Sequence, residues 1–224
     1  MTAVVSTASN EPAHSVIGQN CALLVVDMQN GFCHPGGSFA AMGFDVAALR
    51  TAIGGCRTLI DAAHGPGVPV IFTRFAYQPG YADAGVTSRE LFPQIREHGG
   101  LLAGSWDADL LAELPVSSGD VIIDKSRYSA FYGTRLEPLL RSQRVGSLIV
   151  CGVTTNMCVE TTVRDASQRD YRTFVVGDAT AEFTPERHQN ALDTIRYGFG
   201  WVVDTGQVTG ELAARSRGVT TEEQ

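Results

Sequence analysis

The chain has 224 residues and a formal net charge of −7 at pH 7, and 18% of its residues are charged. This length suits one α/β domain with a sizeable core. The acidic balance argues against nucleic acid or an anionic membrane surface as a partner, because either would require a basic patch. Five cysteines, none in a Cys-x-x-Cys pair, are typical of a reducing compartment rather than a disulfide framework. With no signal-peptide pattern and no apolar run of membrane-spanning length, we expect a cytoplasmic protein.

Short apolar runs alternate with amphipathic segments along the chain. Strands are predicted at residues 21–27, 68–74, 120–125, 148–151, 172–178 and 200–204. Helices are predicted at residues 45–64, 106–114, 134–140, 159–166 and 185–197. This alternation indicates an α/β fold of right-handed βαβ units, with a parallel sheet covered by helices on both faces.

No internal repeat or linker divides this pattern. Residues 1–18 are predicted to be a flexible N-terminal arm, residues 19–210 the folded domain, and residues 211–224 a C-terminal tail. The segment 76–104 shows no clear period. A loop of that length inside a compact domain is usually functional, so we expect it to form a lid or a wall of a substrate site.

Cys158 is the first candidate catalytic residue. It follows the predicted strand 148–151 and Gly152, in the first turn of the helix that residues 154–156 are expected to cap. Unpaired backbone N–H groups and the positive end of the helix dipole favour a thiolate there, and the same groups can hold a developing oxyanion. A buried structural cysteine is the alternative interpretation.

Two charged residues also end predicted strands, namely Asp27 and Lys125. Open parallel sheets bind ligands outside the carboxyl ends of their strands, so these side chains and Cys158 are expected at one edge. Together they suit a thiol hydrolase in which Cys158 attacks, Asp27 transfers the proton, and Lys125 orients Asp27 and lowers the thiol pKa. Taken singly, Asp27 is equally consistent with a turn cap and Lys125 with a solvated strand end.

Three motifs in this order identify a family resemblance. They are Leu24-Val-Val-Asp27-Met-Gln-Asn-Gly-Phe, Asp124-Lys125-Ser-Arg-Tyr-Ser-Ala-Phe and Cys151-Gly-Val-Thr-Thr-Asn-Met-Cys158-Val. Over about residues 20–205 the chain resembles the isochorismatase-like cysteine hydrolase superfamily, which includes nicotinamidases and N-carbamoylsarcosine, biuret and ureidoacrylate amidohydrolases. The resemblance implies a doubly wound sheet of six parallel strands, a catalytic triad of Asp27, Lys125 and Cys158, and a homodimer or homotetramer.

The resemblance also implies a reaction. The family carries a cis peptide at the position of Val153 and Thr154, which would direct the Thr154 N–H towards an oxyanion hole shared with the Cys158 N–H. The expected reaction is attack of the Cys158 thiolate on an amide or ureido carbonyl of a small molecule, release of ammonia or an amine, and hydrolysis of the thioester by water.

Departures from the family pattern bear on the substrate. The nicotinamidases hold a metal through an Asp-x-His pair, and none of the five histidines here follows an aspartate at that spacing. We therefore predict no metal and no cofactor. Cys158 favours C–N cleavage over the vinyl-ether chemistry of true isochorismatases. The segments around Lys125 and Cys158 most resemble the ureidoacrylate and biuret branch. Candidate substrate-binding residues are Gln29, Asn30, Phe32, Arg74, Trp106, Arg127, Tyr128 and Phe131.

Several alternatives stay open at this stage. Arg74 or Arg127 can pair with a substrate carboxylate or take part in a surface or inter-subunit salt bridge. A relative that opens the cyclic amide of streptothricin makes lactam hydrolysis a second candidate activity. A Cys33–His34 pair is a rival nucleophile and base, and a catalytically silent binding module is the non-enzyme interpretation. Nucleotide-dependent chemistry is disfavoured because the sequence contains no phosphate-binding loop.

Overall fold

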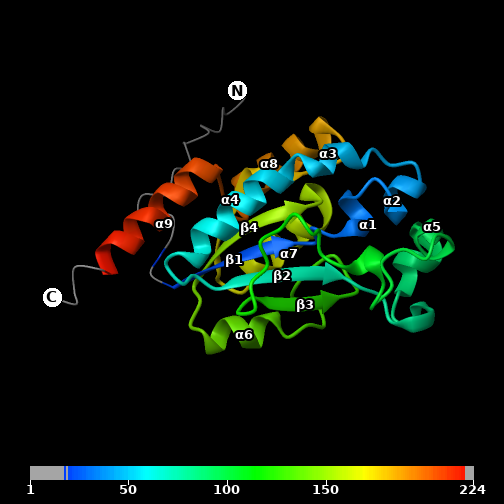
Figure 1. The fold of residues 1–224 in the computed structure, drawn as a ribbon, viewed down its shortest axis with the longest axis horizontal. Coiled ribbons are helices and arrows are strands. Elements are labelled where there is room, and N and C mark those ends of the chain that lie inside the picture. Colours follow the sequence, from blue (N-terminus) through cyan, green and yellow to red (C-terminus); the bar gives the residue numbers. More distant parts are fainter. Residues whose placement is uncertain (1–17, 19, 220–224) are drawn as a thin grey trace, which may run out of the picture.

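The computed structural model describes residue 18 and residues 20–219, with side chains described up to residue 215. The predicted N-terminal arm therefore lies, except for Gly18, outside the described residues, and so does the end of the predicted tail. In the described part of the chain, the secondary structure is an alternation of strands and helices (Figure 1).

Six strands form one parallel sheet within the described residues. They are β1 (Cys21–Val26), β2 (Val70–Phe75), β3 (Val121–Lys125), β4 (Ser147–Val153), β5 (Arg172–Ala181) and β6 (Trp201–Val203). Their order is β3-β2-β1-β4-β5-β6, and all neighbours are parallel. Every residue of β1 and β4 is buried, as expected for central strands covered on both faces. The expected six-stranded, doubly wound α/β fold is confirmed.

Helices cover both faces of this sheet. The longer ones are α4 (Ala52–His64), α6 (Leu136–Ser142), α7 (Glu160–Ser167), α8 (Pro185–Gly198) and α9 (Thr205–Val219). Helix α4 packs against α9, and α7 packs against α8. Because the strand order changes direction between β1 and β4, right-handed connections place these two pairs on opposite faces, and Figure 1 shows α7 behind the sheet and α4 in front.

Short helices fill the connections at the carboxyl edge of the sheet. They are α1 (Asn30–Cys33), α2 (Ser38–Ala41), α3 (Val46–Arg50) and α5 (Pro93–Glu97). The first three lie in the connection that leads from β1 to α4, and α5 lies in the segment 76–104 between β2 and β3. Figure 1 shows α1, α2 and α5 gathered beyond the same end of the sheet.

Three predicted boundaries are corrected. The single helix expected at 45–64 is divided into α3 and α4 at Thr51, whose hydroxyl donates a hydrogen bond to the Ala48 carbonyl. The helix expected at 106–114 is only a 3₁₀ turn (Trp106–Ala108), because Asp107 instead accepts hydrogen bonds from two neighbouring loops. Helix α9 continues past residue 210, where Leu212 is buried in the core.

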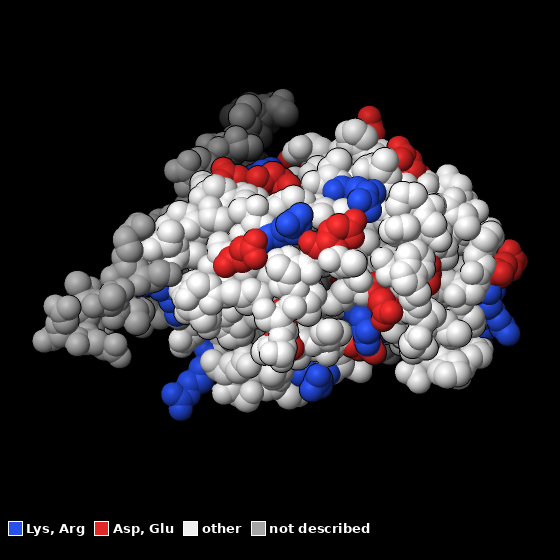
Figure 2. All heavy atoms as spheres, viewed as in Figure 1, with Lys and Arg blue, Asp and Glu red and all other residues white. Residues whose placement is uncertain are grey.

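Surface charge is distributed rather than gathered on the face shown in Figure 2. Acidic and basic side chains alternate there among uncharged ones over the described residues. None of the helices in the described part of the chain combines the length and apolar character that crossing a bilayer requires.

Candidate active site

Asp27 follows β1 directly and is fully buried. Its φ is 50°, in the left-handed region that residues other than glycine seldom occupy. Two contacts to β2 orient it: the Asp27 backbone N–H donates to the Thr73 carbonyl at 3.2 Å, and the Thr73 hydroxyl donates to Asp27 Oδ1 at 2.6 Å. The second carboxylate oxygen, Oδ2, accepts a hydrogen bond from Lys125 at the end of β3, beyond β2.

Lys125 is the last residue of β3, and its side chain is fully buried. Its ammonium donates to Asp27 Oδ2 at 2.6 Å and to the Arg127 carbonyl at 3.1 Å, and lies 4.4 Å from the centre of the Phe75 ring. A third contact, at 3.4 Å, reaches Cys158 Sγ. A buried ammonium is tolerated only with such partners, so this lysine is part of a built site rather than a solvated strand end.

Cys158 lies in a π-helical turn (Thr155–Val159) between β4 and α7, and it is 4% exposed. The Val153–Thr154 peptide that precedes the turn is cis. The N-cap residue of this turn, Thr154, makes no side-chain capping hydrogen bond. Instead, the buried Glu182 carboxylate accepts a hydrogen bond from the Asn156 backbone N–H at 3.4 Å. The structure therefore brings Asp27, Lys125 and Cys158 into one chain of contacts at the carboxyl edge of the sheet.

Gly152 permits the close approach of the two central strands beneath this site. It has a φ of 110°, and a β-carbon at this position would collide with the Val26 carbonyl oxygen. Any larger residue would push β4 away from β1, and with it Cys158 away from Asp27.

Burial determines the protonation of the site. It raises the pKa of the Cys158 thiol; Lys125 opposes this effect, while the Asp27 charge adds to it. Lys125 thus acts on the thiol pKa in the expected direction, but burial outweighs it and the net pKa is raised, because the sulfur is far more enclosed than its position in the sequence suggested. Burial alone would lower the pKa of Lys125, but Asp27 and Cys158 outweigh it and the net pKa is raised. The resting site thus holds a thiol beside an ammonium–carboxylate pair.

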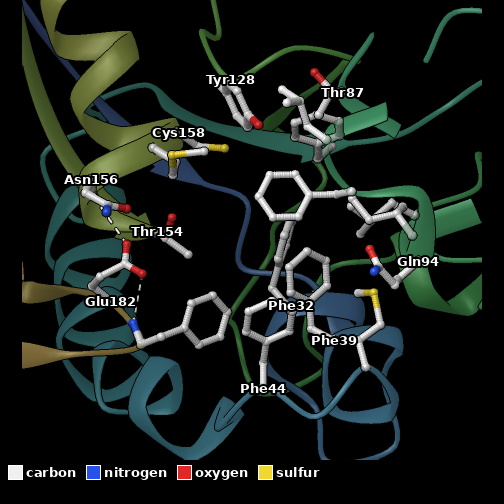
Figure 3. A pocket seen from close by; sticks show the side chains of 18 of the residues that line it. Phe32, Phe39, Phe44, Thr87, Gln94, Tyr128, Thr154, Asn156, Cys158 and Glu182 are labelled. Carbon is white, nitrogen blue, oxygen red and sulfur yellow. Dashed lines mark hydrogen bonds between the residues drawn. The ribbon is translucent and has the colours of Figure 1, made fainter. Parts of the chain in front are cut away.

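Cys158 opens into a cavity of about 680 Å³ (Figure 3). It is lined by Phe32, Phe39, Met42, Phe44, Phe75, Tyr77, Thr87, Leu91, Phe92, Gln94, Ile95, Leu101, Tyr128, Thr154, Asn156, Met157, Cys158, Glu182, Phe183 and Arg187. Asp27 and Lys125 lie behind the sulfur and do not line it, so among these three described residues a bound molecule meets Cys158 first. The segment 76–104 supplies one wall through seven residues, from Tyr77 to Leu101.

Two of the eight predicted substrate-binding residues, Phe32 and Tyr128, line this cavity. Gln29 does not, because its side chain is hydrogen-bonded to both backbone groups of Phe75 and to the Ala108 carbonyl. Asn30 donates to the Trp106 carbonyl at 2.8 Å. Both amides join the β1–α1 loop to neighbouring segments, which corrects their expected role.

The other four predicted pocket residues are also placed elsewhere. The Arg74 guanidinium pairs with Asp124 at 2.7 Å, so the salt-bridge alternative holds for it. Arg127 donates to the Asp83 and Ser126 carbonyls. Trp106 is half exposed and packs edge-on against His34, and Phe131 packs against Tyr171. None of these described side chains lines the cavity, so neither expected carboxylate-binding arginine reaches it.

The rival Cys33–His34 pair is not assembled. Cys33 is fully buried, and burial raises the pKa of its thiol to about 12. The His34 ring accepts a hydrogen bond from the Gly36 N–H instead. Among the described residues, no group of three or more His, Cys, Asp or Glu side chains is placed to hold a metal ion.

A family model described as the isochorismatase domain matches residues 21–207. The chain belongs to the isochorismatase family. It is 38% identical over 210 residues to ureidoacrylate amidohydrolase RutB of Serratia proteamaculans (strain 568), covering 88% of this chain and 84% of that one. Its structure is similar to a cysteine hydrolase from Pseudomonas syringae pv. phaseolicola 1448A, with a TM-score of 0.79, 32% identity and coverage of 88% and 93%.

N-carbamoylsarcosine amidase from Thermoplasma acidophilum is a further structural relative, with a TM-score of 0.68, 29% identity and coverage of 83% of this chain and 96% of that one. These relatives bear out the predicted enzyme class: this isochorismatase-family chain is an amidohydrolase.

Most of the cavity wall of this isochorismatase-family enzyme was missed from sequence. Glu182, Phe183 and Arg187 follow β5, in a segment that contains none of the three motifs. Glu182 lies directly after β5, but the apolar run of this strand ends at Gly177-Asp178, so the sequence pattern points to Asp178 as the acid at the sheet edge. Phe39 and Phe44 carry no usable signal, because their spacing in a turn-rich loop does not indicate which way the rings point.

The raised thiol pKa predicts the pH dependence of Cys158 alkylation. Below its pKa the thiol is protonated, so the reactive thiolate fraction grows about tenfold per pH unit. We expect the rate of Cys158 alkylation by iodoacetamide to be still rising at about pH 9. The alkylation rate of glutathione, measured as a control, should level off near that pH. A plateau reached by about pH 7 would contradict the raised pKa.

Substitution of Thr73 tests whether its hydroxyl positions the Asp27 carboxylate. Thr73→Val keeps the shape of the side chain but removes the hydroxyl that donates to Asp27 Oδ1. The carboxylate oxygen is then buried without this donor, which should lower the free energy of unfolding by about 1–3 kcal/mol. We expect kcat to fall about tenfold through misorientation of the carboxylate. Thr73→Ser should restore most of it, and equal losses in both variants would argue against this positioning role.

Proposed function

We propose that this amidohydrolase cleaves a C–N bond of an amide or ureido compound through a covalent thioester on Cys158. The observation that carries the proposal is the contact chain from Thr73 through Asp27 and Lys125 to Cys158. A buried carboxylate, ammonium and thiol in contact have little structural value, since an apolar core would be as stable. Their contact beneath a cavity that Cys158 alone of the three lines supports chemistry rather than a silent binding module.

In the first half of the reaction, Asp27 accepts the Cys158 proton as the sulfur bonds to the substrate carbonyl carbon. The carbonyl oxygen becomes an oxyanion, held by the backbone N–H groups of Thr154 and Cys158. The C–N bond then breaks, and Asp27 returns the proton to the departing nitrogen. Ammonia or an amine leaves, and the acyl group remains on the sulfur as a thioester.

In the second half, water attacks the thioester carbon while Asp27 accepts a water proton. The C–S bond breaks, the acid is released, and the proton returns to the Cys158 sulfur. Lys125 keeps the Asp27 carboxylate oriented and its charge compensated throughout both halves. Burial raises the pKa of the Cys158 thiol, so the proton that Asp27 accepts is still on the sulfur when the substrate binds.

A panel of amides tests this proposal, with ammonia release as the measurement and ureidoacrylate, biuret, N-carbamoylsarcosine, nicotinamide and maleamate as substrates. Acid quench followed by intact-mass measurement should detect the acyl group on Cys158 during turnover. Turnover without any acyl adduct, and equally fast in Cys158→Ser, would refute the thioester route.

Hydrolysis of a cyclic amide such as a streptothricin lactam is the second candidate, favoured by a cavity of about 680 Å³ that exceeds what a small ureido acid fills. Ring opening is followed by a mass gain of one water. The family resemblance also supports a homodimer or homotetramer, which light scattering of the purified chain would measure.

A further inference from the structure

The cavity wall facing Cys158 is largely aromatic. Phe32, Phe39 and Phe44 form a contiguous series with ring centres 4.5 and 5.4 Å apart, and Phe183 lies 4.8 Å from Phe44. Figure 3 shows Phe39 and Phe44 on the side of the cavity away from Cys158 and Asn156. Burial of a bulky apolar group against such a wall contributes favourable binding free energy, whereas a small, fully polar molecule obtains little from it.

Among the described residues that line this space, the one buried charge is negative. Glu182 is 6% exposed and accepts hydrogen bonds from the backbone N–H groups of Phe183 and Asn156. The Lys125 charge is compensated by Asp27, and Arg187, the cation that lines the cavity, is exposed and therefore screened by water. An anionic group bound near Glu182 would lose its hydration beside a like charge.

Two polar atoms in the lining are unsatisfied among the described residues. They are the hydroxyl of Tyr77 and Oδ1 of Asn156, and both residues line the cavity with Cys158. A buried acceptor without a donor is unfavourable, so a side-chain rotation that brings Asn156 Oδ1 to the cavity surface and onto the N–H of a bound amide would satisfy it, whereas Tyr77 is fully buried and its hydroxyl stays enclosed. The polar requirements of the site are thus those of an uncharged amide.

We propose that the substrate is an uncharged amide bearing a bulky apolar group, preferably an aromatic one. The phenylalanine wall binds that group, Asn156 Oδ1 accepts the amide N–H, and Glu182 excludes anionic groups such as the carboxylate of a small ureido acid. This proposal rests on the proposed function and specifies its substrate class. It separates this chain from the ureidoacrylate amidohydrolase of Serratia proteamaculans.

Alkylation of Cys158 measures this preference without knowledge of the natural substrate. N-benzyl-iodoacetamide, iodoacetamide and iodoacetate are compared at about pH 8 by peptide mapping, each rate divided by the rate with glutathione. We expect the benzyl reagent to exceed iodoacetamide by about 100-fold, since one methylene group in an apolar pocket is worth roughly tenfold or more. Iodoacetate should be slower than iodoacetamide. Equal normalised rates, or faster iodoacetate, would overturn the proposal.

Two variants assign the preference to residues. Phe39→Ala should reduce the benzyl advantage about tenfold, whereas Tyr132→Ala, an aromatic residue that is 66% exposed and lies outside the lining, should not change it. Glu182→Gln keeps a hydrogen-bond acceptor but removes the charge, so the ratio of iodoacetate to iodoacetamide rates should rise about tenfold. An unchanged ratio would remove Glu182 from the proposal.

A turnover assay separates this proposal from the proposed function. If phenylacetamide and 3-phenylpropionamide exceed ureidoacrylate in kcat/KM, both stand. If ureidoacrylate is hydrolysed and the aromatic amides are not, the reaction stands and the substrate class is overturned. If the benzyl reagent labels Cys158 selectively but no amide is hydrolysed, the binding preference stands and the proposed function fails. Absence of labelling by all three reagents would overturn both.

Discussion

Cys158→Ala is expected to lower kcat by at least about 10³-fold, because no other described thiol lines the cavity. The variant leaves the backbone N–H groups of the proposed oxyanion hole in place, so substrate binding should persist while the acyl adduct disappears. Ammonia release and intact-mass measurement on the same samples distinguish these two effects. Cys158→Ser, which nearly matches the thiol in size, should lose activity to a similar extent with a native melting curve.

Cys33→Ala is the matched control. Cys33 is as deeply buried as Cys158 but does not line the cavity, so its removal should change stability slightly and kcat by no more than about twofold. Activity in Cys158→Ala within tenfold of the unmodified enzyme would rule out covalent catalysis by this residue. A comparable loss in Cys33→Ala would mean that packing, not chemistry, explains the result.

Lys125→Ala should damage both stability and chemistry. It leaves the buried Asp27 carboxylate without its cation, which typically lowers the unfolding free energy by about 3–5 kcal/mol. It also removes the neighbour that opposes the raised pKa of Cys158, so alkylation at neutral pH should slow further. Urea denaturation and alkylation kinetics measure the two effects separately.

A double variant distinguishes the loss of a charge partner from simple loss of packing. Asp27→Asn combined with Lys125→Met removes both charges, so it should recover most of the stability that Lys125→Ala loses, yet remain inactive. Arg74→Ala, which breaks the solvent-accessible Arg74–Asp124 pair, should change stability by no more than about 1 kcal/mol. A double variant no more stable than Lys125→Ala would contradict a charge-based account of this pair.

The strands and the contact between Asp27, Lys125 and Cys158 were predictable because both depend on local patterns. Apolar runs locate the strands, and parallel strands bring their carboxyl ends to one edge whatever the loops do. The role of Arg74 was left open between a substrate contact and a salt bridge, because that choice does not depend on a local pattern. The position of Arg74 at the end of β2 was correct, but its choice between a ligand and Asp124 depends on the register of β2 with β3, where the two residues are direct partners.

The direction of the Cys158 pKa shift was beyond sequence reasoning for a physical reason as well. The position of Cys158 in the turn after a strand predicts a local electric field that favours the thiolate. Desolvation of the sulfur, which disfavours the thiolate, depends instead on every segment that packs over it. The segment 76–104 has no hydrophobic period, so the sequence indicated its importance without showing that Tyr77 and Phe92 would face inward. The cavity is a property of assembled loops.

The residues in contact with Cys158 lie at strand ends, whereas most of the cavity wall comes from connections between the elements of the sheet. Reactivity depends on residues fixed by strand pairing, where a shift of one position would dismantle the site. On the proposed function, substrate discrimination depends on the 76–104 connection and on the segment after β5, which line the cavity and lie outside the paired strands. Exchange of these segments between relatives is therefore expected to change the substrate range while Asp27, Lys125 and Cys158 keep their positions.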